Sequence, residues 1–238
     1  RDPETDRQLD DANIRNQVIT FLIAGHETTS GLLTFTLYEL LRNPGVLAQA
    51  YAEVDAVLPG DAPPVYADLA RLPVLDRVLK ETLRLWPTAP AFAVAPFEDV
   101  VIGGRYRLRQ TRRISVVLTA LHRDPKVWEH PERFDIDRFL PENEARLPAH
   151  AYMPFGHGER ACIGRQFALT EAKLALALML RNFAFHDPYD YQFRLKETLT
   201  IKPDNFVLRA RRRRPHERIA AQAVVETATD TEIGRAHV

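Results

Sequence analysis

The segment Phe155–Gly164 (FGHGERACIG) constrains this chain more than any other part of its sequence. It carries Cys162, the single cysteine among 238 residues, between glycines that permit tight turns. One cysteine excludes an internal disulfide framework and fits either a reducing cytosol or a ligating thiol. Because an apolar stretch with helical spacing follows, the segment predicts a loop that delivers this thiol to the start of a helix, whose free N–H groups and dipole stabilise a thiolate.

Two ordinary roles compete with that interpretation of Cys162. A lone cysteine is usually a small buried side chain that contributes packing alone. A zinc site is the other, and it is a poor one, because His157 and Cys162 do not supply four clustered ligands. Arg160, two residues before the cysteine, instead suggests a ligand whose acidic group is bound by a guanidinium.

The segment Ala24–Ser30 (AGHETTS) is the second unusual feature, because it places poor helix formers in the middle of a predicted long helix. Gly25 leaves the backbone open to a ligand, and the Thr28 hydroxyl has a neighbouring carbonyl group to bond. The alternative is an ordinary polar patch on a buried helix. The adjacent HE pair begins the pattern of a zinc metalloprotease helix, but Ser30 occupies the position of the second histidine.

Glu81 and Arg84 form the third feature, because residues three apart on a predicted helix share one face. The simplest interpretation is a surface ion pair, which contributes less than about 1 kcal/mol.

The remaining elements follow from hydrophobic periodicity and from proline and glycine positions. We expect a long helix from a cap at Asp11 or Asn13 to a break at Pro44, and a buried final helix from near Cys162 to about Phe183. The sequence also predicts shorter helices at 46–57 and 73–85, a hairpin at 100–108 and a further buried strand at 114–121. An irregular stretch is expected at 123–154 and a late pair of strands at 191–211.

Composition limits the class of protein. With 45% hydrophobic residues, the chain is long enough for one domain with a core. The 32 basic and 32 acidic residues balance, so nothing points to nucleic acid or to a membrane surface. Charged residues within the final helix argue against a membrane span. The polar opening of the chain leads us to expect a further segment before residue 1.

Over residues 1–213 the chain resembles the C-terminal part of a cytochrome P450. Every specified position of that family's haem-binding signature, Phe-x-x-Gly-x-Arg-x-Cys-x-Gly, is met by Phe155, Gly158, Arg160, Cys162 and Gly164. The segments 24–30 and 81–84 are similar to the family's oxygen-binding and Glu-x-x-Arg motifs, and the three motifs occur in the family's order. The resemblance implies a mainly α fold with small β-sheets, present here as its C-terminal half. Residues 214–238 are rich in Ala, Thr and Glu, which predicts a linker or disordered tail, and the sequence of its end leaves open that it is partly non-native.

The resemblance also implies a role for each motif. Cys162 is the thiolate ligand of haem iron, Arg160 meets a propionate, and Phe155 packs near the sulfur. The resemblance also places four small residues beside the haem. They are Gly158 and Gly164 of the cysteine loop, and Ala24 and Gly25 of the long helix. Protons reach dioxygen through an acid–alcohol pair, Glu27 and Thr28. The substrate pocket receives Ala24, Thr88, Ala89 and Leu199.

In the family, the Glu-x-x-Arg pair locks to an arginine of the irregular segment. The literal PERF at 131–134 nominates Arg133. The family, however, usually places a phenylalanine two residues before that motif, after a tryptophan and a short acidic stretch. Here that residue is Phe134, so the motif becomes Ile136–Phe139 (IDRF) and Arg138 joins Glu81 and Arg84.

Within the family, the chain most resembles self-sufficient bacterial fatty-acid hydroxylases, in which a flavin reductase follows the haem domain. This implies insertion of one oxygen atom from dioxygen into a C–H bond of a lipophilic, fatty-acid-like substrate. Haem b is the cofactor of this part. NADPH, FAD and FMN act only through a reductase, fused or separate, that lies outside this chain. We expect a cytoplasmic protein with no nucleic-acid partner.

Other functions stay open at this point. A stand-alone monooxygenase with separate redox proteins, or a peroxygenase that uses hydrogen peroxide, would share the same signature; Thr28 argues mildly against the peroxygenase. A non-catalytic haem-binding or sensor protein has no need of Glu27 and Thr28. The last alternative is an inactive truncated chain.

Overall fold

The computed structural model describes residues 8–214 and Glu217. Its longest element is helix α1 (Asp11–Arg42). The Asp10 carboxylate caps this helix by accepting a hydrogen bond from the Asn13 N–H at 2.7 Å, so the expected caps, Asp11 and Asn13, were wrong. Pro44 lies at the first turn of α2 (Pro44–Val57), where its missing N–H costs nothing, and this separates the two helices as predicted.

The other helices include two long ones that pack against α1. Helix α3 matches its predicted bounds, whereas α6 begins three residues after Cys162, because the backbone up to its N-cap Gly164 is still a turn. The helical segments are η1 (Tyr66–Arg71), α3 (Pro73–Leu85), α4 (Leu118–Leu121), η2 (Ile136–Phe139), α5 (Pro141–Glu144), η3 (Gly158–Arg160) and α6 (Arg165–Asn182).

The strands of the described chain form two-stranded antiparallel sheets. The pairs are β1 (Ala91–Val94) with β4 (Ile114–Val117), β2 (Val100–Ile102) with β3 (Tyr106–Leu108), β5 (Phe183–His186) with β8 (Arg209–Arg212), and β6 (Leu195–Glu197) with β7 (Ile201–Pro203). The predicted hairpin is β2–β3, and its turn places Gly103 and Gly104 at φ +57° and +67°, as a tight hairpin turn requires.

Two strand predictions were incomplete. The expected strand at 114–121 ends at Val117 and continues as α4, with half-exposed alternation in place of full burial. The late segment contains three strands, and β8 pairs with β5, which directly follows α6. Phe183 is extended because its partner in the ladder is Arg212, a non-local contact that local periodicity does not reveal.

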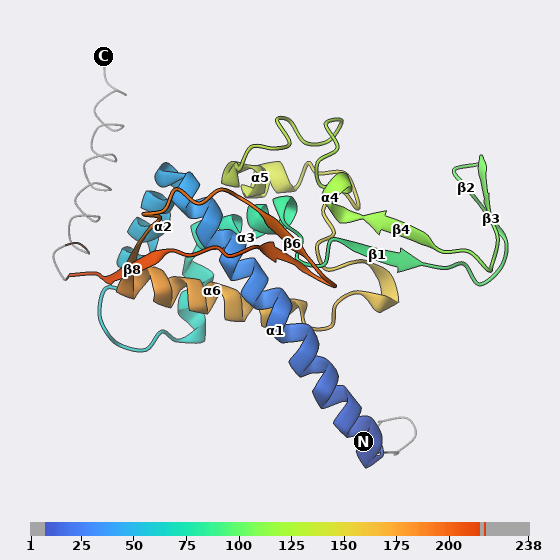
Figure 1. Cartoon of the computed structure of the whole chain (residues 1–238), viewed down its shortest axis with the longest axis horizontal. Helices are drawn as coiled ribbons and strands as arrows, with labels where there is room; N and C mark the ends of the chain where they lie inside the picture. The colour runs from blue at the N-terminus through green and yellow to red at the C-terminus, as the bar shows by residue number, and fades with distance from the viewer. Residues whose placement is uncertain (1–7, 215–216, 218–238) are drawn as a thin grey trace.

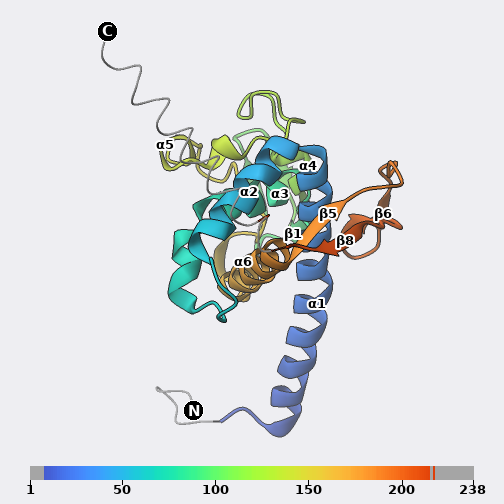
Figure 2. The same cartoon turned by 90° about the vertical axis from the view of Figure 1, so that its left-hand side faces the viewer.

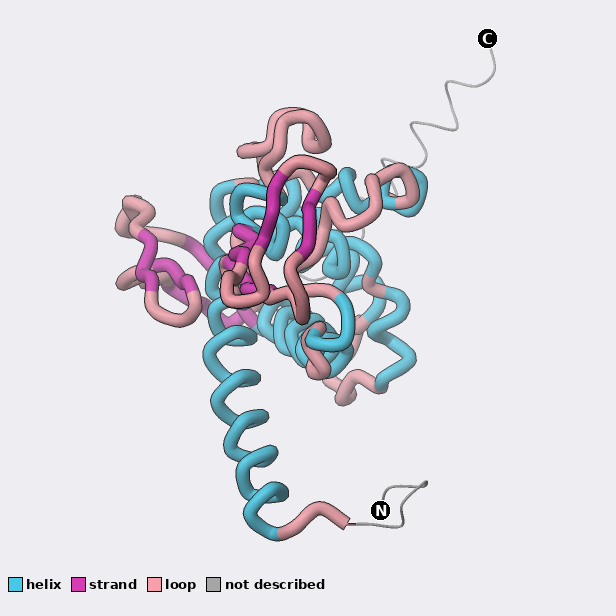
Figure 3. Tube along the Cα trace, turned by 90° about the vertical axis from the view of Figure 1, so that its right-hand side faces the viewer, coloured by secondary structure: helices cyan, strands magenta, loops and turns pink. Residues whose placement is uncertain are grey.

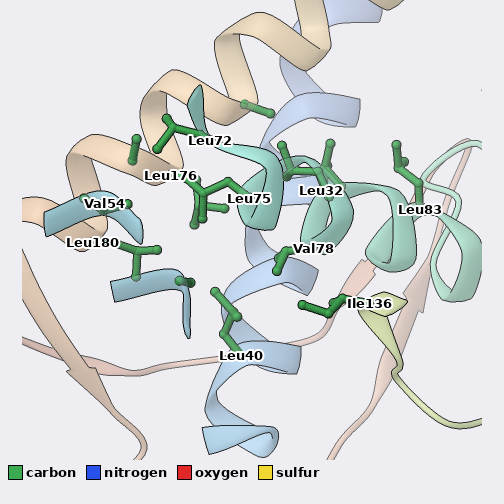
Figure 4. Close-up of a cluster of buried hydrophobic side chains, with 14 of the residues drawn as sticks. Leu32, Leu40, Val54, Leu72, Leu75, Val78, Leu83, Ile136, Leu176 and Leu180 are labelled. Atoms are coloured by element: carbon green, nitrogen blue, oxygen red, sulfur yellow. The ribbon is translucent and has the colours of Figure 1, made fainter. Parts of the chain in front are cut away.

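The hydrophobic core lies where α1, α2, α3 and α6 meet. Figure 4 shows Leu32, Val54, Leu75 and Leu176, one from each helix, in a single cluster of buried side chains. Gly31 lets α1 approach its neighbours closely, since a Cβ there would lie 3.2 Å from Thr88 Cγ2 and 3.3 Å from the Ile201 carbonyl oxygen. The core therefore fixes α1 through its C-terminal half.

The N-terminal half of α1 projects from this body. Figures 1, 2 and 3 show it as an isolated helical arm that no other described element covers. Its exposed large side chains include Ile14, Val18, Phe21, Leu22 and Ile23. Among the helices of the described residues, none is both long and apolar enough to cross a bilayer.

Candidate functional site

The cysteine loop has the geometry that the sequence predicts. Gly156 and Gly158 adopt φ +73° and +76°, which only glycine adopts without strain. The Cys162 N–H donates to the Phe155 carbonyl oxygen at 2.9 Å and closes the loop. This holds the thiol outside the core, and Cys162 is exposed.

The start of α6 lies next to the sulfur. Gly164 is the N-cap of the helix, and a Cβ at that position would lie 3.8 Å from Cys162 Sγ, an ordinary van der Waals distance that places this helix end beside the sulfur. The first N–H groups of α6 have no acceptor within the helix, as at the start of any helix. Phe155 is partly buried against the core, and the Arg165 guanidinium lies 5.8 Å from its ring centroid. Arg160 is exposed, so its guanidinium is accessible to an anionic ligand group.

The motif on α1 presents an open, small-residue surface. Ala24 and Gly25 are exposed, and a Cβ at Gly25 would meet nothing within 4 Å. The Thr28 hydroxyl donates to the Ala24 carbonyl oxygen at 2.7 Å, as expected from its position. Glu27 Oε1 lies 3.6 Å from Lys202 Nζ on β7, a partner that the sequence reasoning missed because it is a contact between distant segments.

Glu81 and Arg84 are fully buried, which excludes the surface ion pair. Arg84 donates to both Glu81 carboxylate oxygens, at 2.7 and 2.8 Å. Burial raises the pKa of Glu81, and the hydrogen bonds from Arg84 oppose that shift. Arg138 Nε lies 3.4 Å from Glu81 Oε1, whereas Arg133 has an exposed side chain and contributes its backbone carbonyl to Arg84.

Arg84 also holds the irregular segment after α4. Its guanidinium donates to the carbonyl oxygens of His122, Pro131 and Arg133, at 2.9, 2.7 and 3.0 Å. His122 is fully buried, and its Nε2 accepts the Met153 N–H at 3.0 Å. Sequence reasoning did not single out His122, because its role depends on a backbone that has no periodic pattern.

The residues expected at the substrate pocket lie in different surroundings. Thr88 is buried against α1, and its carbonyl oxygen accepts the Ile201 N–H at 2.9 Å. Ala89 is exposed, and Leu199 is 86% exposed in the turn between β6 and β7. A cavity of about 390 Å³ lies elsewhere, at the C-terminal end of α1, beside Tyr38 and Tyr191.

The chemistry of the donors fits a haem. Within the described residues, no cluster of three or more His, Cys, Asp or Glu side chains could hold a metal ion. A single exposed thiol would therefore need a prosthetic group to supply the other ligands of an iron ion. The open small-residue surface of α1 and the accessible Arg160 suit a flat ligand with acidic substituents.

Known proteins resemble this chain closely. The Cytochrome P450 family model matches residues 1–210. The chain is 53% identical over 206 residues to bifunctional cytochrome P450/NADPH–P450 reductase 1 of Bacillus subtilis (strain 168), covering 86% of this chain and 19% of that protein. It is 49% identical over 216 residues to a self-sufficient cytochrome P450 monooxygenase of Aspergillus niger, covering 90% of this chain and 20% of that protein.

A solved structure agrees in fold. The crystal structure of the cytochrome P450DA heme domain matches with a TM-score of 0.89 at 61% identity, covering 91% of this chain and 48% of that chain. The chain thus spans about a fifth of the length of the curated relatives and about half of that haem domain. The expected mainly α architecture with small β-sheets is confirmed, and the chain belongs to the cytochrome P450 family.

Proposed function

We propose that the protein containing this chain is a haem-thiolate monooxygenase that inserts one oxygen atom from dioxygen into a C–H bond of a fatty-acid-like substrate. The observation that carries the proposal is the exposed thiol of Cys162 beside the N-terminus of α6. Electrons come from NADPH through the FAD and FMN of a reductase. The names of the bacterial relatives, which join a cytochrome P450 to an NADPH–P450 reductase, support this source.

When bound, haem supplies the dioxygen-binding and redox chemistry. Cys162 would provide the sulfur ligand to the iron of that group. Arg160 would pair with a propionate, and Phe155 would pack beside the sulfur and tune its potential. Gly158 and Gly164 keep the loop narrow, and Ala24 with Gly25 leaves room for a flat ligand at α1.

Proton delivery falls to α1. Thr28 Oγ1 holds a proton against the Ala24 carbonyl oxygen at rest. Glu27, the preceding residue, serves as the acid of the pair, and its Oε1 lies 3.6 Å from Lys202 Nζ. The pair therefore links bulk water to the surface of α1 on which Ala24 and Gly25 lie.

Substrate contacts are assigned to Ala24, Thr88, Ala89 and Leu199. The backbone bond from Ile201 to Thr88 supports this grouping, because it brings the β6–β7 turn near the segment after α3. The haem-domain portion extends to residue 213, and the reduced state of the single cysteine suits the cytoplasm.

The test is Cys162→Ser in a full-length protein that contains this chain. A serine hydroxyl is a far poorer anionic ligand than a thiolate, so the thiolate-type band of the reduced carbonyl complex and substrate hydroxylation are both expected to disappear. An unchanged band would identify a different ligand.

The electron source is tested separately in the unaltered protein. NADPH alone should sustain hydroxylation of a fatty acid with bound FAD and FMN present. Activity with hydrogen peroxide but none with NADPH would assign the protein to the peroxygenases instead. A requirement for added redox proteins would identify a stand-alone monooxygenase.

A further inference from the structure

One arginine of the basic run Arg209–Arg214 differs from its neighbours. Arg209, Arg211 and Arg212 are exposed, but the Arg213 side chain is only 5% exposed. Its guanidinium donates to both carboxylate oxygens of Asp55 on α2, at 2.8 and 2.7 Å, and Asp55 is 1% exposed. Burial of its guanidinium sets Arg213 apart from the solvent-exposed arginines on either side of it.

Arg213 joins elements that are distant in sequence. Its Nη1 also donates to the Leu180 carbonyl oxygen at 3.1 Å, and its backbone N–H donates to the Asn182 carbonyl oxygen at 2.9 Å. The guanidinium carbon lies 4.6 Å from the ring centroid of Tyr51. The residue following β8 is thus fixed to both α2 and the end of α6, which Figure 1 shows beside β8.

Glu217, the last described residue, also contacts this basic run. Arg211 forms an ion pair with Glu217 at 2.7 Å, and the Arg214 N–H donates to Glu217 Oε2 at 2.7 Å. Arg213 Nη2 reaches the Glu217 carbonyl oxygen at 3.3 Å. These contacts lie beyond residue 210, where the match to the family model ends.

Burying the Arg213–Asp55 ion pair costs desolvation free energy, and holding β8 in place does not require a charged pair. Two buried charges lose hydration, and apolar side chains would close the same space as well or better. The curated relatives are about five times as long as their match to this chain, and their names place a reductase in the same protein. The buried Arg213–Asp55 ion pair is suited to hold the chain at the position where it leaves the haem domain.

We propose that Arg213 is a positioning residue: with Asp55 it anchors the segment that leaves the haem domain, and so fixes where the connection to the reductase becomes flexible. This inference rests on the proposed fused reductase. The effective concentration of a tethered domain falls roughly as the −3/2 power of the flexible length. Release of the anchor lengthens that stretch, so electrons reach the haem more slowly while the haem site itself is unchanged.

The experiment compares full-length variants by stopped-flow in the presence of carbon monoxide. Asp55→Asn with Arg213→Gly removes the tether without leaving a buried charge behind. Arg212→Gly is the control, because it alters the exposed neighbour in the same run. If release doubles the flexible length, NADPH-driven haem reduction slows about threefold in the double variant. Reduction of the haem by dithionite keeps its full amplitude.

Arg213→Lys retains the charge and is expected to restore most of the rate. A double variant that reduces its haem from NADPH as fast as the Arg212→Gly control overturns the proposal. Loss of the carbonyl-complex band after dithionite reduction of the double variant also overturns the proposal. The Arg213–Asp55 pair would then serve only to stabilise the haem domain. The unaltered protein can instead show the carbonyl-complex band with dithionite but no haem reduction by NADPH. That result would reject the proposed fused reductase, and the proposed role of Arg213 would be rejected with it.

Discussion

At the scale of single residues, Thr28 and Thr34 allow a direct comparison on one helix. Each hydroxyl donates to the carbonyl oxygen four residues earlier, at 2.7 Å in both cases. Such a contact has little effect on helix stability by itself. A special property of Thr28 must therefore come from its position next to Glu27 and the open surface of α1.

We expect Thr28→Ala in the full-length protein to leave haem incorporation unchanged. Without the hydroxyl, protons are delivered poorly, and reducing equivalents form peroxide or water in place of product. The measurement is product formed per NADPH consumed, together with peroxide released. Thr34→Ala removes the same backbone contact and should keep the normal ratio; equal ratios in both variants would exclude a proton-delivery role for Thr28.

At the scale of elements, the irregular segment after α4 is held to α3 by a buried charge. Most of Arg84's donors bind backbone carbonyl groups that no helix or sheet satisfies. The carboxylate of Glu81 additionally accepts the Asp135 N–H at 2.9 Å. A segment without periodic hydrogen bonding thereby acquires a defined path.

Arg138 and Arg133 are expected to differ sharply on replacement. Arg138→Ala removes the 3.4 Å contact with Glu81 and a 2.9 Å bond to the His130 carbonyl oxygen. Because Arg84 still pairs with Glu81, we expect a loss of about 1–3 kcal/mol of unfolding free energy. Arg133→Ala removes an exposed side chain and should cost less than about 0.5 kcal/mol. Urea unfolding and haem content measure both; the reverse order would identify the literal PERF as the lock.

His122 makes the same junction sensitive to acid. Burial lowers its pKa from 6.5 to about 4, and the neighbouring positive charges of Arg84 and Arg123 add to that effect. In the unfolded chain, His122 takes up a proton near pH 6.5, whereas in the folded protein it takes up that proton only near pH 4. Stability is therefore complete above pH 6.5, falls as the pH drops toward 4, and loses on the order of 3 kcal/mol across that window.

The measurement is the unfolding free energy of the full-length protein at pH 7.5 and pH 4.5. His122→Gln should lack the part of the pH dependence that this histidine contributes. His186→Gln alters an exposed histidine and serves as the control. Identical pH dependence in all three proteins would show that His122 already titrates normally in the fold.

At the scale of the whole molecule, the exposed surfaces do not suit an isolated chain. Phe21, Leu22 and Ile23 are 54%, 69% and 67% exposed on the arm of α1, and Phe167 is 75% exposed on α6. Apolar exposure of this extent marks surfaces that other chain segments cover. The proposed haem site has one wall on α1 and another at Cys162, and both are exposed.

Residues 1–238 alone are therefore expected not to bind haem stably. The test is addition of haemin to the purified chain, followed by the reduced carbonyl spectrum. A complete haem domain that contains the chain serves as the control. A stoichiometric thiolate-type band from residues 1–238 would show that the two exposed walls are sufficient.

The sequence by itself predicted the proposed chemistry of the site, because that prediction depends on local spacing. The cysteine loop, the Thr28 contact, the C-terminal end of α2 and both ends of α3 follow from glycine, proline and helical periodicity. The tertiary structure decided what depends on distant partners: Lys202 at Glu27, the carbonyl groups at Arg84, the pairing of β8 with β5, and Asp55 at Arg213. The arginine run illustrates the reason. Its residues look alike in sequence, and only the packing of α2 against α6 selects Arg213 for burial.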